Sequence, residues 1–96
     1  MIELTEETYK QEIATGTVLV DFYAPWCGVC KMLKPKLEDL KHIKVCMADV
    51  DKWPKIAVEH GISNLPTLIL YQDGKEQKRG VFDLLKEIGG EANEKE

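Results

Sequence analysis

The chain has 96 residues, 44% of them hydrophobic and 31% charged, a composition typical of an ordinary globular protein. This length suffices for one domain with a real hydrophobic core but not for two, so residues 1–96 are expected to form a single domain. The net charge of −4, with no cluster of Lys and Arg interleaved with aromatic residues, argues against nucleic acid as the main partner.

Strands and helices alternate along the first part of the chain. Residues 2–4 are expected to form a short strand, and Thr5 is a suitable N-cap for a helix over residues 6–14. Gly16 is suited to the position that follows the end of this helix. The apolar run at residues 18–24 predicts a buried strand.

The alternation continues after this strand. Apolar residues recur at helical spacing and predict a long helix over residues 27–41. Residues 43–50 are expected to form the next strand. Pro54 suits the first turn of a short helix that ends before Gly61.

The last part of the chain predicts a hairpin followed by a helix. Strands at residues 67–72 and 76–79 flank Asp73-Gly74, a strong signal for a two-residue turn. An apolar stripe at residues 81–88 predicts the final helix. The fold class is therefore α/β, with a mixed central sheet of four to five strands and helices on both faces. Beyond this helix, residues 91–96 are expected to be a frayed tail.

Two cysteines one helical turn apart, Cys27 and Cys30, carry the clearest chemical signal. Side chains at this spacing lie on one helix face, close enough to form a disulfide without backbone movement. Cys27 falls at the predicted helix N-terminus, where unpaired N–H groups and the helix dipole stabilise a thiolate, whereas Cys30 is expected to be more buried and less ionised. A nucleophilic thiol beside a resolving thiol is suited to dithiol–disulfide exchange.

Two alternatives stand beside redox chemistry for this pair. Half of a zinc site is one, but the remaining candidate ligands, Cys46, His42 and His60, lack matching spacing, so no metal is expected. A purely structural disulfide is the other. Cys46 itself is expected to be a small buried hydrophobe.

Asp21 lies inside the apolar run of the second strand. An unpaired carboxylate is costly there, and burial tends to raise its pKa. We therefore expect Asp21 to take part in proton transfer rather than to pair with solvent.

Several segments resemble the thioredoxin family. They are residues 20–31, which contain Trp-Cys-Gly-Val-Cys, residues 49–51 ahead of Pro54, residues 61–68, which contain Leu-Pro-Thr, and then Asp73-Gly74 and Gly80. The resemblance covers the whole chain and implies the thioredoxin fold. It also implies that Cys27 attacks the substrate disulfide, that Cys30 resolves the mixed disulfide, and that Asp21 assists proton transfer at Cys30.

The resemblance further implies a docking surface around Cys27. Pro66 would be a cis-proline beside the disulfide, and the backbone of Leu65 would pair with an incoming peptide as an added strand. Trp26 would donate a hydrogen bond to Asp51. The residues expected to contact the substrate protein are Trp26, Gly28, Val29, Leu65, Pro66, Gly80 and Val81.

Two of the departures from the family pattern bear on the chemistry. Val29 stands where thioredoxins usually carry proline, which adds an N–H donor near the sulfurs and is expected to make the potential somewhat more oxidising. Met47 stands where many thioredoxins carry a lysine near the buried aspartate. Without that cation, the pKa of Asp21 is expected to be higher than in lysine-bearing relatives.

The function expected from the sequence is the reduction of disulfides in client proteins by a monomeric thiol–disulfide oxidoreductase with no bound cofactor. The resemblance implies recycling by thioredoxin reductase, an NADPH-dependent flavoenzyme. Alternatives are a disulfide oxidase or isomerase, a donor reduced by glutathione, and a non-catalytic binding module. The apolar runs are too short to span a membrane, and no signal-peptide segment is expected. Three cysteines do not suggest a disulfide framework, so a reducing, cytoplasmic setting is expected, although a mature exported protein would look the same.

Overall fold

The computed structural model describes residues 1–89, which form five strands and four helices. The expected tail at residues 91–96 lies outside this range. In chain order, the elements are β1 (Ile2–Glu3), α1 (Tyr9–Glu12), β2 (Thr17–Tyr23), α2 (Gly28–Glu38), β3 (Lys44–Asp49), α3 (Pro54–Glu59), β4 (Thr67–Gln72), β5 (Lys75–Gly80) and α4 (Phe82–Ile88).

The five strands form one mixed sheet in the order β1-β3-β2-β4-β5. The pairs β1/β3 and β2/β3 are parallel, while β2/β4 and β4/β5 are antiparallel. The predicted turn is present, since both Asp73 and Gly74 have positive φ angles, 53° and 84°. The mixed sheet expected from the sequence is confirmed.

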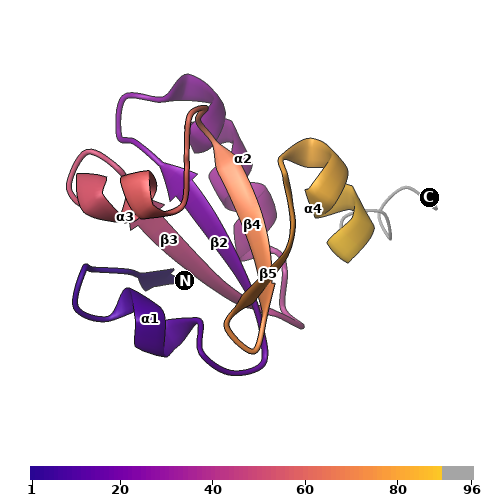
Figure 1. The fold of residues 1–96 in the computed structure, drawn as a ribbon. Coiled ribbons are helices and arrows are strands. Elements are labelled where there is room, and N and C mark those ends of the chain that lie inside the picture. The colour runs from indigo at the N-terminus through magenta and orange to yellow at the C-terminus, as the bar shows by residue number, and fades with distance from the viewer. Residues whose placement is uncertain (90–96) are drawn as a thin grey trace.

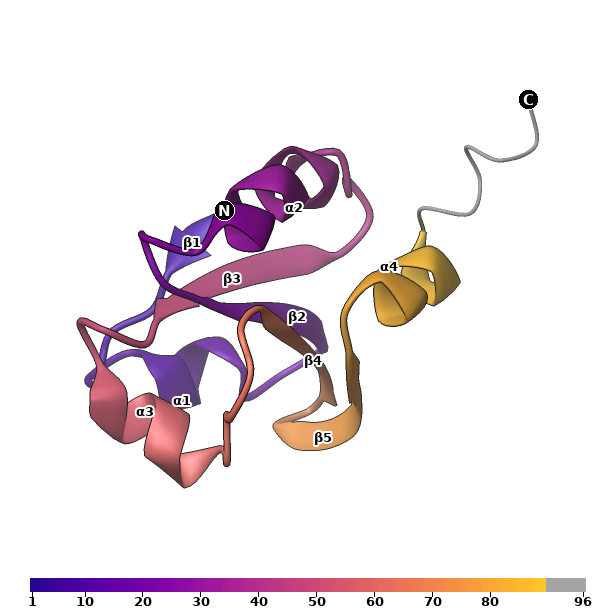
Figure 2. The same cartoon turned by 90° about the horizontal axis from the view of Figure 1, so that it is seen from above.

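Helices cover both faces of the sheet, as Figure 1 and Figure 2 show: α1 and α3 lie on one face, and α2 and α4 lie on the other. Because side chains of a strand alternate between faces, β2 contributes to two apolar layers. Val18, Val20 and Phe22 pack in the layer with α1 and α3. Leu19 packs with Leu33 of α2 in the other layer. The side chain of Asp21 follows Leu19 on the α2 face.

Helix α1 is shorter than the helix expected over residues 6–14, and Gly16 does not follow its end. The Oγ1 of Thr5 does act as a cap, accepting hydrogen bonds from the N–H groups of Glu7 and Thr8 at 3.2 Å, but it closes a turn rather than a helix. Gly16, with φ 75°, instead bonds through its N–H to Asp73 Oδ1 at 2.8 Å, which ties the start of β2 to the hairpin.

Helix α2 also ends earlier than the expected Lys41, at Glu38, and Cys27 is its N-cap rather than its first helical residue. Helix α3 begins at Pro54 as expected and ends in two Schellman hydrogen bonds, from Gly61 N–H to the Val58 carbonyl and from Ile62 N–H to the Ala57 carbonyl. Within residues 1–89, no helix is both long and apolar enough to cross a membrane.

Candidate active site

The two cysteines form a disulfide at the junction between β2 and α2, with their α-carbons 5.2 Å apart. The chain turns after Ala24, whose carbonyl accepts a hydrogen bond from Cys27 N–H at 3.1 Å. Cys27 then caps α2, and its Sγ accepts a hydrogen bond from Cys30 N–H at 3.2 Å. Cys27 is 6% exposed and Cys30 is 4% exposed, so the two cysteines hardly differ in exposure. They differ in their position relative to α2.

Cys27 lies at the N-terminus of α2, a position that favours a negatively charged sulfur once the disulfide is reduced. The N–H groups of the first helical turn have no acceptor within the helix, and one of them already points at the Cys27 sulfur. These donors and the helix dipole stabilise a negative charge on that sulfur. Cys30 lies a turn inside α2.

A cis-proline lies beside the disulfide. The Leu65–Pro66 peptide bond is cis, as the family resemblance implied. Leu65 packs against the small cluster of Ala24, Cys27 and Cys30. The segment that precedes β4 is therefore adjacent to the sulfurs.

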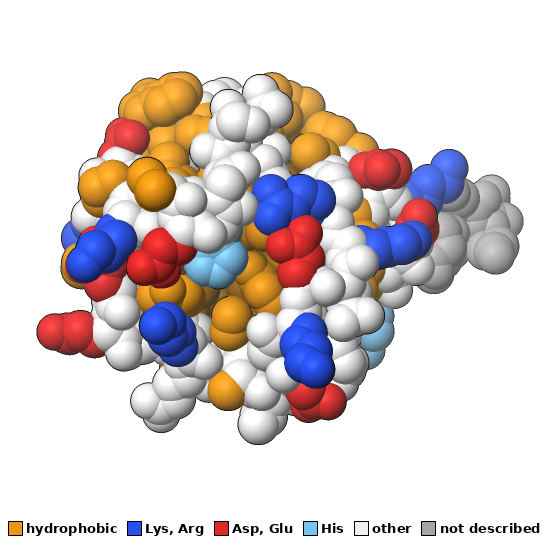
Figure 3. Space-filling model, in the orientation of Figure 1, with side chains coloured by type: hydrophobic (Ala, Val, Ile, Leu, Met, Phe, Trp, Pro, Cys, Tyr) orange, Lys and Arg blue, Asp and Glu red, His pale blue; other side chains and the backbone are white. Residues whose placement is uncertain are grey.

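Trp26 is the most exposed aromatic residue of this region, at 68%. Its Nε1–H donates to Asp51 Oδ2 at 2.7 Å, which confirms the expected hydrogen bond and fixes the indole on the surface. Hydrophobic side chains gather at this end of the molecule, where α2 begins (Figure 3).

Sequence reasoning missed several residues of this surface. A hollow of about 410 Å³ lies beside Trp26, and Ala57, Ile62 and Asn64 help to line it. These residues come from α3 and the loop after it, so only the tertiary structure places them here. Met32 and Phe82 are exposed apolar residues of α2 and α4. The signal for Met32 was present, since it lies off the buried face of α2 defined by Leu33 and Leu37.

Asp21 is fully buried, and its carboxylate oxygens have no hydrogen-bond partner. Its neighbours in register are apolar: Met47 on β3 and Leu68 on β4. Burial raises the pKa of Asp21 from 3.8 to about 7, and the negative charge of Glu3 adds to the effect. The raised pKa expected from the sequence is confirmed, and a carboxyl group with this pKa can gain and lose a proton near neutral pH.

We expect the Met47→Lys substitution to lower the pKa of Asp21 below about 7, because it places a cation on the strand position in register with the carboxylate. An NMR titration of the Asp21 carboxyl carbon measures the change. Met47→Leu is the matched control, since it keeps an apolar side chain there. A pKa of Asp21 that is unchanged or raised in Met47→Lys would count against this interpretation of the site.

The remaining candidates lie apart from the disulfide. Cys46 is a free, fully buried thiol whose pKa burial raises to about 11, as expected for a small core residue. Among residues 1–89, no group of three or more potential ligands is arranged to hold a metal ion.

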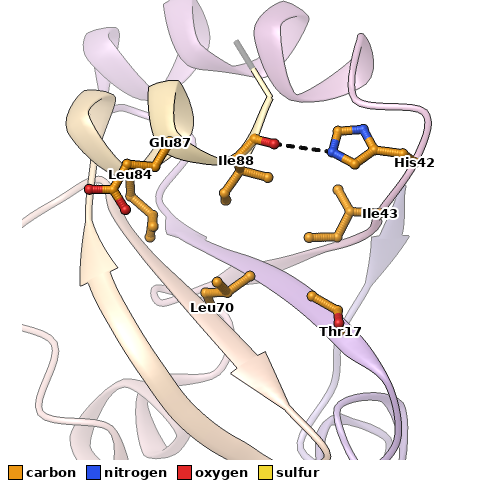
Figure 4. Close-up of a pocket in the computed structure, with 7 residues that line it drawn as sticks. All are labelled: Thr17, His42, Ile43, Leu70, Leu84, Glu87 and Ile88. Atoms are coloured by element: carbon orange, nitrogen blue, oxygen red, sulfur yellow. Dashed lines mark hydrogen bonds between the residues drawn. The ribbon is translucent and has the colours of Figure 1, made fainter. Parts of the chain in front are cut away.

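A second hollow, of about 370 Å³, lies near the start of β2. At its rim, His42 Nε2 lies within hydrogen-bond distance of the Ile88 carbonyl (Figure 4).

Known proteins share this fold and sequence. The thioredoxin family model matches residues 1–87. The thioredoxin of Chlamydia trachomatis serovar D is 45% identical over 82 residues, which cover 81% of this chain and 80% of that protein. The thioredoxin of Bacillus subtilis strain 168 is 38% identical over 80 residues, covering 78% of this chain and 77% of that protein. Among solved structures, mitochondrial thioredoxin 3 from Saccharomyces cerevisiae, in its oxidised form, is 31% identical with a TM-score of 0.81, covering 92% of both chains.

A mixed five-stranded sheet with a disulfide at the start of a helix, beside a cis-proline, defines a dithiol–disulfide exchange protein. The chain belongs to the thioredoxin family and is a thiol–disulfide oxidoreductase. Its active-site sequence is Cys-Gly-Val-Cys, with Val29 in the position between the cysteines where the family usually has proline.

Proposed function

We propose that this protein reduces disulfides of client proteins, with Cys27 as the attacking thiol and Cys30 as the resolving thiol. The observation that carries the proposal is the position of the two sulfurs: Cys27 caps α2, and the cluster that contains both cysteines packs with Tyr23, which lies on the same face of β2 as Asp21. The helix-terminal N–H that points at the Cys27 sulfur and the buried carboxyl group of Asp21 on the α2 face of the sheet support this division of roles.

In the proposed reaction, the Cys27 thiolate attacks one sulfur of the client disulfide. A bond forms between Cys27 and that sulfur, and the other client sulfur leaves with the electron pair and takes a proton from water. Cys30 then gives its proton to the Asp21 carboxylate and attacks the Cys27 sulfur. The bond between Cys27 and the client breaks as the Cys27–Cys30 disulfide forms, and the second client sulfur leaves with the electron pair and takes a proton from water. Two electrons have then passed to the client.

The proposed docking surface consists of Trp26, Gly28, Val29, Leu65, Pro66, Gly80 and Val81. The N–H and carbonyl groups of Leu65 would pair with an extended client segment, since the cis bond at Pro66 lies at the start of β4 beside the disulfide. The exposed Trp26 indole supports the same role, because an aromatic ring held by one hydrogen bond offers a rigid apolar contact.

We further propose that the chain is a single-domain monomer, acts in the cytoplasm, holds no cofactor, and is recycled by an NADPH-dependent thioredoxin reductase. Mixing the oxidised protein with such a flavoenzyme and NADPH tests the recycling step. We expect NADPH oxidation in proportion to the protein, and none with Cys27→Ser. Reduction by glutathione but not by the flavoenzyme would contradict this proposal and favour a glutathione-linked donor.

The Val29→Pro substitution is expected to make the potential of the Cys27–Cys30 pair more reducing. Val29 is the second residue of α2, so its N–H is one of the helix-terminal donors that favour a thiolate and thereby the reduced state. Proline removes that donor, whereas the control Val29→Ala keeps it. Redox titration of the three proteins measures the difference. A potential in Val29→Pro that is unchanged or more oxidising would show that this donor has no such role.

A further inference from the structure

A row of side chains in register runs across the sheet beneath α2 and reaches Asp21 from the edge. Glu3 of β1 is in register with Met47 of β3, and Met47 is in register with Asp21 of β2. Residues paired in register point to the same face of a sheet. Glu3 therefore lies on the Asp21 side, two strand spacings away, or roughly 10 Å along the sheet.

Tyr23 links this edge to the sulfurs. It follows Asp21 by two positions on β2, so its side chain is on the same face. Its hydroxyl donates to the Glu3 carboxylate, with distances of 3.0 Å to Oε1 and 3.2 Å to Oε2. Its ring also packs against the cluster that contains Cys27 and Cys30. Glu3 is thus held by a residue that lies on the same strand as Asp21 and contacts the disulfide region.

Few other charges face Asp21. Helix α2 presents the two cysteines and the apolar Leu33 and Leu37, while β3 and β4 present the apolar neighbours in register, Met47 and Leu68. Asp49, the partner of Tyr23 in register on β3, is the next acidic group along the sheet. Apart from burial, the negative charge of Glu3 is the influence that raises the pKa of Asp21.

We propose that Glu3, held in place by the Tyr23 hydroxyl, is a positioning residue whose charge acts on Asp21 across the sheet and so shifts the pH at which Asp21 accepts the proton of Cys30. The inference rests on the proposed role of Asp21 as that acceptor. In this step the Cys30 S–H bond breaks and an Asp21 O–H bond forms. The Cys30 sulfur then bonds to Cys27, and the client sulfur leaves with the electron pair.

The Glu3→Gln variant tests the proposal, because the amide oxygen still accepts the Tyr23 hydrogen bond but carries no charge. The step is isolated by forming a mixed disulfide between Cys27 and a chromophoric thiol and following release of that thiol against pH. We expect the midpoint of the pH profile, and of an NMR titration of the Asp21 carboxyl, to fall by roughly half to one pH unit. Because Glu3 is exposed, high salt should reduce the difference between the two proteins.

Glu7→Gln is the matched control, since it removes the same charge from an exposed residue nearby in the sequence. Equal midpoints in Glu3→Gln and Glu7→Gln would overturn the inference. The Asp21→Asn variant distinguishes a failure of this inference from a failure of the proposed function. If Asp21→Asn leaves the pH profile of thiol release unchanged, both the acceptor role of Asp21 and the inference are wrong. If Asp21→Asn removes the pH step and Glu3→Gln leaves it in place, only the inference is wrong.

Discussion

Replacing Asp21 with Asn should stabilise the protein strongly at pH 8 and scarcely at all near pH 4. Burial without a hydrogen-bond partner raises the pKa of Asp21 to about 7 in the folded state, against an ordinary value of 3.8. Between these two values the folded state binds more protons than the unfolded state, so the free energy of unfolding falls as the pH rises. The loss is about 1.4 kcal/mol per pH unit and reaches about 4 kcal/mol above pH 7.

Asn has nearly the same shape as protonated Asp but cannot ionise, so the free energy of unfolding of the variant does not fall in this way as the pH rises. Urea unfolding of both proteins near pH 4 and at pH 8 measures the difference in the free energy of unfolding. Asp39→Asn, which changes an exposed aspartate, is the control and should show no comparable dependence on pH. A stabilisation by Asp21→Asn that is equal at both pH values would mean that Asp21 is not held protonated by burial.

Cys27→Ser should abolish disulfide reduction, whereas Cys30→Ser should trap the client as a long-lived mixed disulfide. A serine hydroxyl at the start of α2 is not ionised near neutral pH, so the first attack should slow by roughly a thousandfold or more. In Cys30→Ser the first attack is intact, but no second thiol is present to release the client. Mass spectrometry after incubation with a disulfide-bonded protein detects the trapped species.

Cys46→Ala is the control for the third cysteine, because Cys46 is buried away from the disulfide and should be dispensable for turnover. The assignment of the attacking thiol would be contradicted by reductase activity in Cys27→Ser. It would be contradicted equally by a mixed disulfide that forms on Cys30 rather than on Cys27.

The sequence alone was sufficient where the signals were local. The junction between a buried strand and a helix at Cys-x-x-Cys follows from the apolar run that leads into this motif, although α2 begins one residue later than expected, and the hairpin follows from Asp73-Gly74. The cis bond at Pro66 came from the family resemblance, because X–Pro bonds are usually trans. The boundaries of α1 were wrong because the Thr5 cap closes a turn that does not propagate as a helix before Tyr9.

What the sequence did not reveal depends on register and on tertiary contacts. The path from Glu3 to Asp21 exists only because β1, β3 and β2 pair in a particular register, and a shift by one residue would turn Glu3 to the other face. The hollow beside Trp26 depends likewise on where the end of α3 lies relative to β2. Leu65, which packs against the cluster of Cys27 and Cys30, is likewise distant from them in sequence.

The most direct test of the reductase function is a redox titration of the Cys27–Cys30 pair, followed through the fluorescence of the adjacent Trp26. We expect a potential near roughly −270 mV, the established value for thioredoxin itself, displaced slightly toward oxidising values by Val29. A potential between about −180 and −120 mV, the range of disulfide isomerases and oxidases, would contradict a role as a reductant of client proteins.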